Sequence, residues 1–418
     1  MDRYGRVAGV FKNCEGFIVY VREYYNRKMK KDKKKYSVLI VAYDVGLLLV
    51  LSLVTYLKRE NPLADISLLT NRELDSITGQ ITQFVSKVIH VRSYNGKFKK
   101  VKAVQLVNKF FFLFSFIRLS FCKYDIVNIH FAKPVLLKAM PWIAKSSKNI
   151  VITPWGSDVL RLEDENAIKR MRLIYGYASF VTCRPDTQLG LSVIEKFKFD
   201  SKRMCPLRWG VDFVDYIEEF SPNRTEEESK TRFGLSGRYV ISCGYSTAPS
   251  HRHDAIIDAV SSVRGELPNN LTLLFPFTYG WGSQGYVQSI KDKCCRLGLD
   301  AVFVEDYLNM EDLYTLRMAT DIFVHVQVSD AGAACVMQYI LCRKKIVHGS
   351  WMKYVDLEQF SPLFYYPVDR LEDLGKVILE AYHSNGIDIP EGVIATIMDR
   401  GWNKEIKKWD ELFSSLAK

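Results

Sequence analysis

The chain has 418 residues, of which 48% are hydrophobic and 25% are charged, a composition typical of a folded globular protein long enough for two α/β domains. Its formal net charge of +11 is compatible with an anionic membrane surface, a phosphorylated substrate or nucleic acid as partner. No helix-turn-helix, zinc-finger or RNA-recognition signature accompanies this charge, so we expect no nucleic acid.

Residues 1–35 form the first distinct segment, in which aromatic and apolar residues precede the lysine-rich run from Arg27 to Lys35. Two interpretations stay open: a poorly ordered basic extension, and an arm that binds a membrane surface or a partner. The segment has no apolar run of the signal-peptide kind. None of the nine cysteines forms a CxxC pair, and several lie in apolar runs, which indicates buried, reduced thiols. We therefore expect a cytoplasmic protein.

A continuous apolar run from Tyr36 to Tyr43 predicts a buried strand of a parallel sheet. A turn at Gly46 and a helix over residues 47–58 complete a first βα unit, which lacks the GxGxxG pattern of dinucleotide binding. Further strands fit residues 65–69, 87–91, 126–130 and 149–153, and their alternation with helices predicts a doubly wound domain. His130 ends one of these strands, where a histidine is more often a core residue than a catalyst.

The segment from Val101 to Phe121 is apolar nearly all round and follows a basic stretch, Lys97 to Lys102. It is either a crossover helix buried in the domain or an interfacial helix whose flanking lysines meet lipid headgroups. We favour burial for the helix and a membrane role for the basic stretch.

A strand that ends at Thr153 leads into a loop within the sequence VITPWGSDVLR. Loops at the carboxyl ends of parallel strands line the ligand cleft of α/β proteins, so this loop is a candidate site. Gly156 permits tight geometry, and Ser157 or Asp158 is suited to cap the next helix. Asp158 is therefore either a helix cap or a group that contacts substrate.

A second domain begins after the sequence MCPLRWGVD (residues 204–212) and the polar stretch 221–230. Its first strand ends at Gly244, and the loop that follows carries His251 and Arg252. Arginine binds phosphate through two parallel hydrogen bonds and keeps its charge, which makes Arg252 a candidate anion ligand. Strands over residues 271–275 and 302–304 come next, with Tyr307 in the loop after the second.

Residues 320–354 combine a strand, a loop of small residues and a helix over residues 334–341. This layout points backbone N–H groups at an anion, and Ala331, Gly332 and Ala333 let a phosphate approach the main chain closely. Asp330 stands in the loop, and Gln338 follows about two helical turns later.

The TPWGSD loop, the RWGVD element and the Asp330/Gln338 stretch together resemble GT-B-fold retaining glycosyltransferases, family 4 in particular, of bacterial polysaccharide and lipid-linked glycan biosynthesis. The signature of that family is two glutamates separated by seven residues, so both acids are altered here. The resemblance implies a GT-B fold, in which two Rossmann-like doubly wound domains face each other across a cleft.

The resemblance also implies an order of domains along the chain. A basic extension (1–35) precedes an acceptor-side domain (36–212) and a linker (213–237). A nucleotide-sugar-binding domain (238–395) follows, and a C-terminal helical segment (396–418) packs back toward the first domain.

By the same resemblance, Asp158 is an acceptor contact or base, Arg252 stabilises the leaving group, and Asp330 lies by the donor sugar. Further donor-binding residues are then Gly46, Gly244, His251, Tyr307, Ala331, Gly332, Ala333 and Gln338, the last through the ribose. The acceptor side also includes His130, Trp155, Gly156 and Ser157.

The activity implied is transfer of a sugar from a UDP-, GDP- or dTDP-sugar to a hydroxyl of a lipid-linked glycan, with retention of configuration and without a metal or cofactor. The protein would work in the cytoplasm, either free or on the cytoplasmic face of an anionic membrane. Because fold does not fix function, two alternatives stay open: a binding or scaffold protein on the same fold, and a nucleotide-sugar epimerase of GT-B type.

Overall fold

The computed structural model describes residues 35–75, 78–91, 101–280, 282–332 and 334–417. Most of the basic N-terminal extension, the lysines of residues 97–100 and Ala333 therefore lie outside the described residues.

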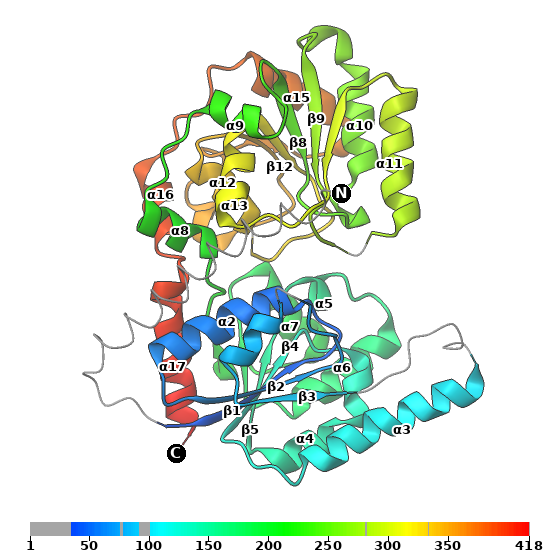
Figure 1. Cartoon of the computed structure of the whole chain (residues 1–418), viewed down its shortest axis with the longest axis vertical. Helices are drawn as coiled ribbons and strands as arrows, with labels where there is room; N and C mark the ends of the chain where they lie inside the picture. Colours follow the sequence, from blue (N-terminus) through cyan, green and yellow to red (C-terminus); the bar gives the residue numbers. More distant parts are fainter. Residues whose placement is uncertain (1–34, 76–77, 92–100, 281, 333, 418) are drawn as a thin grey trace, which may run out of the picture. The chain divides into compact units, whose positions relative to one another are not determined.

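The described strands form two parallel sheets (Figure 1). The first has seven strands in the order β3-β2-β1-β4-β5-β6-β7, and the second has six in the order β10-β9-β8-β11-β12-β13. Each sheet begins its strand order at one edge, returns to its first strand and then grows in the other direction, which is the doubly wound pattern. The predicted fold class of two doubly wound α/β sheets is confirmed.

The strands of the first sheet are β1 (Ser37–Ala42), β2 (Asp65–Thr70), β3 (Lys87–His90), β4 (Ile126–His130), β5 (Asn149–Thr153), β6 (Phe180–Thr182) and β7 (Met204–Cys205). Those of the second sheet are β8 (Tyr239–Cys243), β9 (Leu271–Pro276), β10 (Ala301–Val304), β11 (Ile322–His325), β12 (Lys345–Gly349) and β13 (Tyr366–Val368).

The helices that connect the strands of the first sheet are α2 (Leu47–Glu60), α3 (Lys102–Leu119), α4 (Met140–Ser146), α5 (Ser157–Leu160), α6 (Glu165–Gly176) and α7 (Gln188–Phe197). The helices that follow are α8 (Asp212–Phe220), α9 (Glu226–Arg232), α10 (His253–Ser262), α11 (Gln284–Arg296), α12 (Met310–Met318), α13 (Ala334–Leu341), α14 (Val355–Glu358), α15 (Leu374–His383), α16 (Glu391–Met398) and α17 (Trp402–Leu416).

The chain folds into two compact units. Unit 1 contains the described parts of residues 1–130, 138–151 and 406–418, and unit 2 those of residues 131–137 and 152–405. The domain boundaries expected from the sequence stay a prediction.

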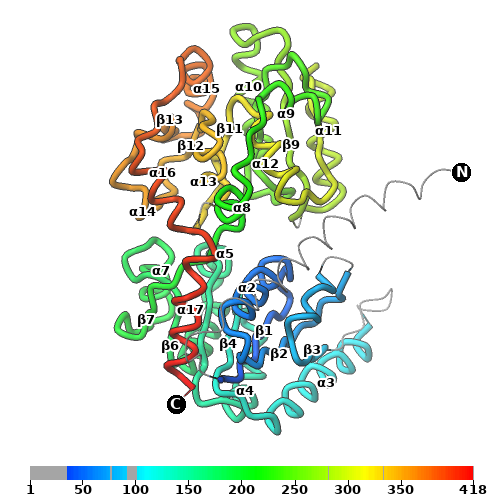
Figure 2. Tube along the Cα trace, turned by 60° about the vertical axis from the view of Figure 1, so that its left-hand side comes forward, coloured from blue at the N-terminus to red at the C-terminus, as the bar shows by residue number. Residues whose placement is uncertain are grey.

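The C-terminal part of α17 belongs to unit 1, so the last residues of the chain return to its first strand (Figure 2). Buried Asp410 of α17 accepts hydrogen bonds from the Tyr36 hydroxyl at 2.9 Å and from Nδ2 of Asn61 at 2.8 Å. The Phe413 ring packs edge-on against Tyr36 with ring centroids 5.9 Å apart. A buried carboxylate thus ties the C-terminal helix to β1 and to the residue after α2.

We expect Asp410→Ala to lower the free energy of unfolding by about 2–5 kcal/mol, because two buried donors lose their acceptor. Urea denaturation followed by circular dichroism measures the change. Glu411→Ala is the matched control, because it removes the same charge from an exposed neighbour on α17. Equal midpoints for the two variants would contradict the importance of this contact.

The apolar helix α3 is not the buried crossover helix that we favoured from the sequence. Its buried residues are Phe112, Phe116 and Leu119, whereas Phe110 is 63% exposed and Leu106 is 68% exposed. The expectation was wrong because the composition of a helix that is apolar all round does not say which faces have neighbours. Within the described ranges, no helix is long and apolar enough to cross a bilayer.

The six-stranded sheet of unit 2 is covered by helices on both faces (Figure 1). Alternate residues along β11 divide between the two faces: Ile322 and Val324 pack with α10, α11 and α15, and Phe323 packs with α13. This alternation follows from the period of two along a strand. Burial on both faces explains why the strands read as continuous apolar runs.

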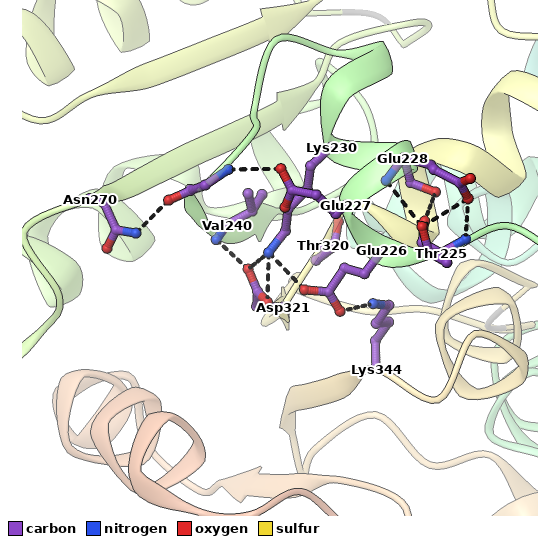
Figure 3. A network of polar contacts seen from close by, with 12 residues as sticks. Thr225, Glu226, Glu227, Glu228, Lys230, Val240, Asn270, Thr320, Asp321 and Lys344 are labelled. Carbon is purple, nitrogen blue, oxygen red and sulfur yellow. Dashed lines mark hydrogen bonds and ion pairs between the residues drawn. The ribbon is translucent and has the colours of Figure 1, made fainter.

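A network of charged side chains lies at the amino ends of the strands of this sheet (Figure 3). Lys230 of α9 donates to Glu226 at 2.7 Å and contacts Asp321, and Lys344 donates to the other oxygen of Glu226 at 2.8 Å. Asp321 also accepts a bond from the backbone N–H of Val240. Two acids and two lysines thus balance their charges and attach α9 to the amino ends of the strands.

The RWGVD element takes part in a second charged cluster of unit 2. Arg208 contacts Asp356 at 2.6 Å, and Arg400 contacts the other oxygen of Asp356 at 2.8 Å. Arg184 also pairs with Asp356. Three arginines from distant segments therefore converge on one carboxylate, which holds the segment after β7 and the residues just before α17 together.

Candidate functional site

Three loops of unit 2 come together: the loop after β5, the loop after β8 and the loop after β11. Gly156 has φ +111°, and a Cβ built on it would lie 2.5 Å from Cβ of Ala331. Both the positive φ and this close approach require glycine. The backbone of the TPWGSD loop therefore passes directly against the small-residue loop that precedes α13.

Arg161 connects the same three loops. Its Nη2 donates to the backbone carbonyl of Ser329 at 2.7 Å, and its Nε donates to the Ser329 hydroxyl at 3.0 Å. Its Nη1 donates to the hydroxyl of Ser250 at 3.0 Å. The planar guanidinium thus bridges the segments on either side of the candidate site.

Asp158 is buried in the first turn of α5 and is not the side-chain cap that the sequence suggested, because α5 has no such cap and the carboxyl group binds the turn that precedes the helix. Its Oδ1 accepts hydrogen bonds from the backbone N–H groups of Trp155 at 2.9 Å and Gly156 at 3.0 Å. Its Oδ2 has no hydrogen-bond partner among the described residues. Burial raises the pKa of Asp158 to about 7, against the opposing effect of the two N–H groups. A carboxyl group with such a pKa exchanges protons near neutral pH.

Asp330 is held by partners on both of its oxygens. Oδ1 accepts from the backbone N–H groups of Ala331 at 2.8 Å and Gly332 at 3.4 Å. Oδ2 accepts from the hydroxyl of Tyr354 at 3.1 Å and lies 3.5 Å from Nε2 of His325. Burial works to raise the pKa of Asp330, but these partners, His325 foremost, outweigh it and lower the pKa to about 2. Asp330 is therefore ionised and fixes the shape of its loop.

Gln338 is also engaged. Its side-chain oxygen accepts a hydrogen bond from Nε of Arg317 at 3.0 Å. Nη1 of the buried Arg317 donates to the hydroxyl of Tyr339 at 3.0 Å, and that hydroxyl donates to Ser242 at 2.9 Å. The amide nitrogen of Gln338 is the part of this side chain left to recognise a ligand.

Arg252 occupies the loop after β8 in a left-handed conformation, with φ +59°. Its guanidinium lies over the ring of Trp351, 5.1 Å from the centroid, and its Nη1 donates to the carbonyl of Val326 at 3.4 Å. It thus stands at the carboxyl end of β11, where a βαβ sheet receives an anion. Stacking on an aromatic ring leaves most of its donors available.

His251 packs behind Arg252 rather than beside it in solvent. The side chain is 3% exposed, and its ring centroid lies 4.2 Å from that of Tyr245. Burial lowers the pKa of His251 well below its ordinary value, so the imidazole is neutral. Gly244 has φ +66°, and a Cβ there would lie 3.0 Å from Cβ of His251. Glycine therefore lets this histidine pack against the end of β8.

The remaining predicted residues fall into two groups. In unit 2, Trp155 is half-buried between the rings of Phe131 and Trp209, and Ser157 and Tyr307 are exposed. Gly46 and His130 belong to unit 1. His130 is fully buried, and burial lowers its pKa to about 3. Gly46 begins α2 in an extended conformation with open space at its Cβ position.

Sequence reasoning missed four residues of this site: Arg161, Arg317, His325 and Tyr354. Arg161 stands in the same motif as Asp158, and its charge beside the loop was an available signal. Tyr354 and Arg317 reach the site from 24 and 21 positions away from their partners Asp330 and Gln338, and no local pattern marks them. Within the described part of the chain, no group of three or more His, Cys, Asp and Glu side chains could hold a metal ion.

Comparison with known proteins gives structural relatives alone. No protein-family model and no curated protein matches the chain. HepE of Anabaena, solved in complex with UDP and glucose, is 15% identical with a TM-score of 0.65, over 91% of this chain and 100% of HepE. A glycosyltransferase of Rickettsia africae is 14% identical with a TM-score of 0.65, over 92% of this chain and 99% of that one. Sucrose-phosphate synthase of Thermosynechococcus elongatus is 12% identical with a TM-score of 0.66, over 92% and 99% of the two chains.

At these identities the likeness establishes the fold, and it extends over nearly the whole of each relative. Together with the strand orders of the two sheets, it assigns the chain to the GT-B class of two-domain α/β proteins.

We expect the stability of the wild type relative to Asp158→Asn to fall as the pH rises. Between about pH 4 and 7 the unfolded state has released the proton of this carboxyl group, whereas the folded state still holds it. The difference in the free energy of unfolding should therefore decrease by about 2–3 kcal/mol between about pH 5 and 7. Urea denaturation at several pH values measures it, and a difference that does not change with pH would contradict the raised pKa.

Proposed function

We propose that the protein is a glycosyltransferase that moves a sugar from a nucleotide-sugar donor to a hydroxyl group of a glycan acceptor. One observation carries the proposal: the TPWGSD loop, with its proton-exchanging Asp158, meets the loops that carry Arg252 and Asp330. A group suited to an acceptor hydroxyl and groups suited to a diphosphate thus belong to one site. HepE of similar fold has been solved with UDP and with UDP-glucose, which supports this class of donor.

In this proposal the departing diphosphate is stabilised by Arg252 and by the N-terminal end of α13. Arginine holds phosphate through two hydrogen bonds, and a helix N-terminus carries partial positive charge. The reaction needs no metal or cofactor and retains the configuration of the sugar. The N–H groups of Ala331 and Gly332 already donate to Oδ1 of Asp330, and the small side chains of these two residues leave a phosphate room to approach the start of α13.

Asp158 is the proposed acceptor contact or base, and Asp330 has a supporting role. Because both oxygens of Asp330 accept hydrogen bonds, we propose that it orients the loop that receives the donor. Gly46, Gly244, His251, Tyr307, Gln338, His130, Trp155 and Ser157 stay predicted members of the donor and acceptor sites.

The proposed acceptor is a lipid-linked glycan at the cytoplasmic face of a membrane. The basic balance of the chain supports this acceptor, because both an anionic bilayer and a pyrophosphate carrier attract positive charge. WaaG, a glycosyltransferase involved in lipopolysaccharide biosynthesis, has a similar fold at 12% identity and a TM-score of 0.57.

One specific observation favours a second candidate, a sugar-nucleotide-binding protein without turnover on the same fold. The two positions of the family's glutamates are Asp330, which is fully hydrogen-bonded, and Gln338, whose oxygen is occupied by Arg317. Donor binding without product in any acceptor assay would mark this case.

We expect one class of nucleotide sugar, among UDP-, GDP-, CMP- and dTDP-sugars, to raise the melting temperature of the protein. A ligand present at about 100 times its dissociation constant adds about 2.7 kcal/mol to stability. Arg252→Ala should abolish most of the shift, and Arg296→Ala, which removes an exposed arginine from α11, should preserve it. No shift with any of the four classes, or an equal shift in both variants, would contradict the proposed donor site.

With the donor identified, we expect turnover to continue in excess EDTA and to give a product with the anomeric configuration of the donor. NMR of the anomeric proton of the product measures both the amount of product formed in EDTA and its anomeric configuration. Inverted product would exclude retention, and activity lost in EDTA and restored by Mg²⁺ would exclude the metal-independent mechanism.

A further inference from the structure

The surface of unit 1 contains an unusual apolar face on α3. We call it the α3 face and define it by Leu106, Val107, Phe110, Phe111 and Phe114. These residues form two adjacent rows with a spacing of four, 106–110–114 and 107–111, so they share one side of the helix. Phe112, Phe116 and Leu119 point the other way and attach α3 to unit 1. Phe112 packs on the ring of Tyr43 at 5.4 Å.

The five apolar side chains of the α3 face are largely exposed to solvent. Its members are between 39% and 68% exposed, and three of the five are phenylalanines. An apolar hollow of about 610 Å³ runs along it, lined among the described residues by Leu106, Val107, Lys109, Phe110 and Leu113. Scattered exposed apolar residues are ordinary, but a contiguous apolar patch marks a surface that binds something.

The part of the sequence that contains α3 is strongly basic. Between Asp75 and Asp158 the sequence has one acid, Asp125, and thirteen basic residues: Lys87, Arg92, Lys97, Lys99, Lys100, Lys102, Lys109, Arg118, Lys123, Lys133, Lys138, Lys145 and Lys148. Lys102, Lys109 and Arg118 are exposed on α3 itself. Across the described residues, none of the three forms an ion pair with an acid.

We propose that the α3 face docks on an anionic lipid bilayer, with its apolar rows in the headgroup and upper acyl region and its basic residues at the lipid phosphates. A helix with an apolar face and basic flanks lies in the interface plane of a membrane in this way. Figure 1 shows α3 along the outside of unit 1, in agreement with the exposure of the five residues of the face.

Charge argues against the two other occupants that the chain itself could supply. Residues 1–35 contain eleven Lys and Arg residues against four acids, so this segment would be repelled by the basic surroundings of α3. A second copy of the chain would bring two basic patches together, because a two-fold contact buries the same surface on both subunits. Anionic lipid satisfies both the apolar rows and the positive charge.

Vesicle flotation tests the proposal, with phosphatidylcholine vesicles compared with vesicles that contain about one-third phosphatidylglycerol. Wild-type protein should float with the anionic vesicles. Phe110→Ser/Phe114→Ser should weaken this binding by at least about tenfold, because the buried phenyl area is lost. The matched control Leu173→Ser/Leu191→Ser removes two apolar residues of similar exposure, 59% and 57%, from α6 and α7 and should float like the wild type.

A charge variant, Lys102→Glu/Lys109→Glu, changes exposed side chains without touching the core and should lose flotation with anionic vesicles at moderate salt. Circular dichroism melting of every variant verifies that the fold is retained. The proposal is overturned if wild type does not float, or if the α3 and control variants float equally. A wild-type dimer in light scattering that becomes a monomer in Phe110→Ser/Phe114→Ser, without flotation, would assign the face to a second copy. Flotation needs no substrate, so its result is independent of the proposed activity.

Discussion

The contact between the backbone of Gly156 and the side chain of Ala331 is the constraint on which the candidate site depends. No residue with a Cβ fits at position 156, because φ is +111° and Ala331 fills the space. Arg161 then ties the same loop to Ser250 and Ser329 through three hydrogen bonds. A packing constraint and a guanidinium bridge together hold the loop after β5 against the loops after β8 and β11. The position of Asp158 relative to Arg252 follows from them.

Several acids of unit 2 are paired with basic or hydroxyl side chains, whereas Oδ2 of the buried Asp158 has no hydrogen-bond partner among the described residues. Asp356 is shared by three arginines, and Asp321 and Glu226 are paired with lysines at the amino edge of the six-stranded sheet (Figure 3). Asp330 is fixed by a tyrosine, a histidine and its own loop. These carboxyl groups hold segments in place through their hydrogen bonds and ion pairs. Asp158 differs because burial raises its pKa to about 7. A carboxyl group with such a pKa is typical of residues that take part in a reaction.

Helix α3 serves two surfaces at once. One row of aromatic and apolar residues anchors it to unit 1, and the rows on the other side meet solvent beside unpaired basic residues. Phe112, Phe116 and Leu119 pack in the core of unit 1. The exposed side chains of Phe110 and Phe114 are not explained by that packing. Apolar area exposed to water lowers solubility, so an apolar face of this kind indicates a binding surface. The proposed lipid bilayer would cover it.

The sequence alone determined the alternation of strands and helices, because apolar runs of the length of a buried strand and glycine-marked turns are local signals. Strands such as β4 and β5 and helix α13 begin and end where the sequence predicts. The sequence also identified the loops at the carboxyl ends of β5, β8 and β11, since parallel sheets place ligands there. It could not show that both oxygens of Asp330 are occupied or that Arg317 holds Gln338, because Tyr354, His325 and Arg317 reach these residues only through tertiary packing. Nor could it decide which side of α3 is buried. A helix that is apolar all round has the same sequence whichever face finds a neighbour, so only the folded chain distinguishes core from surface.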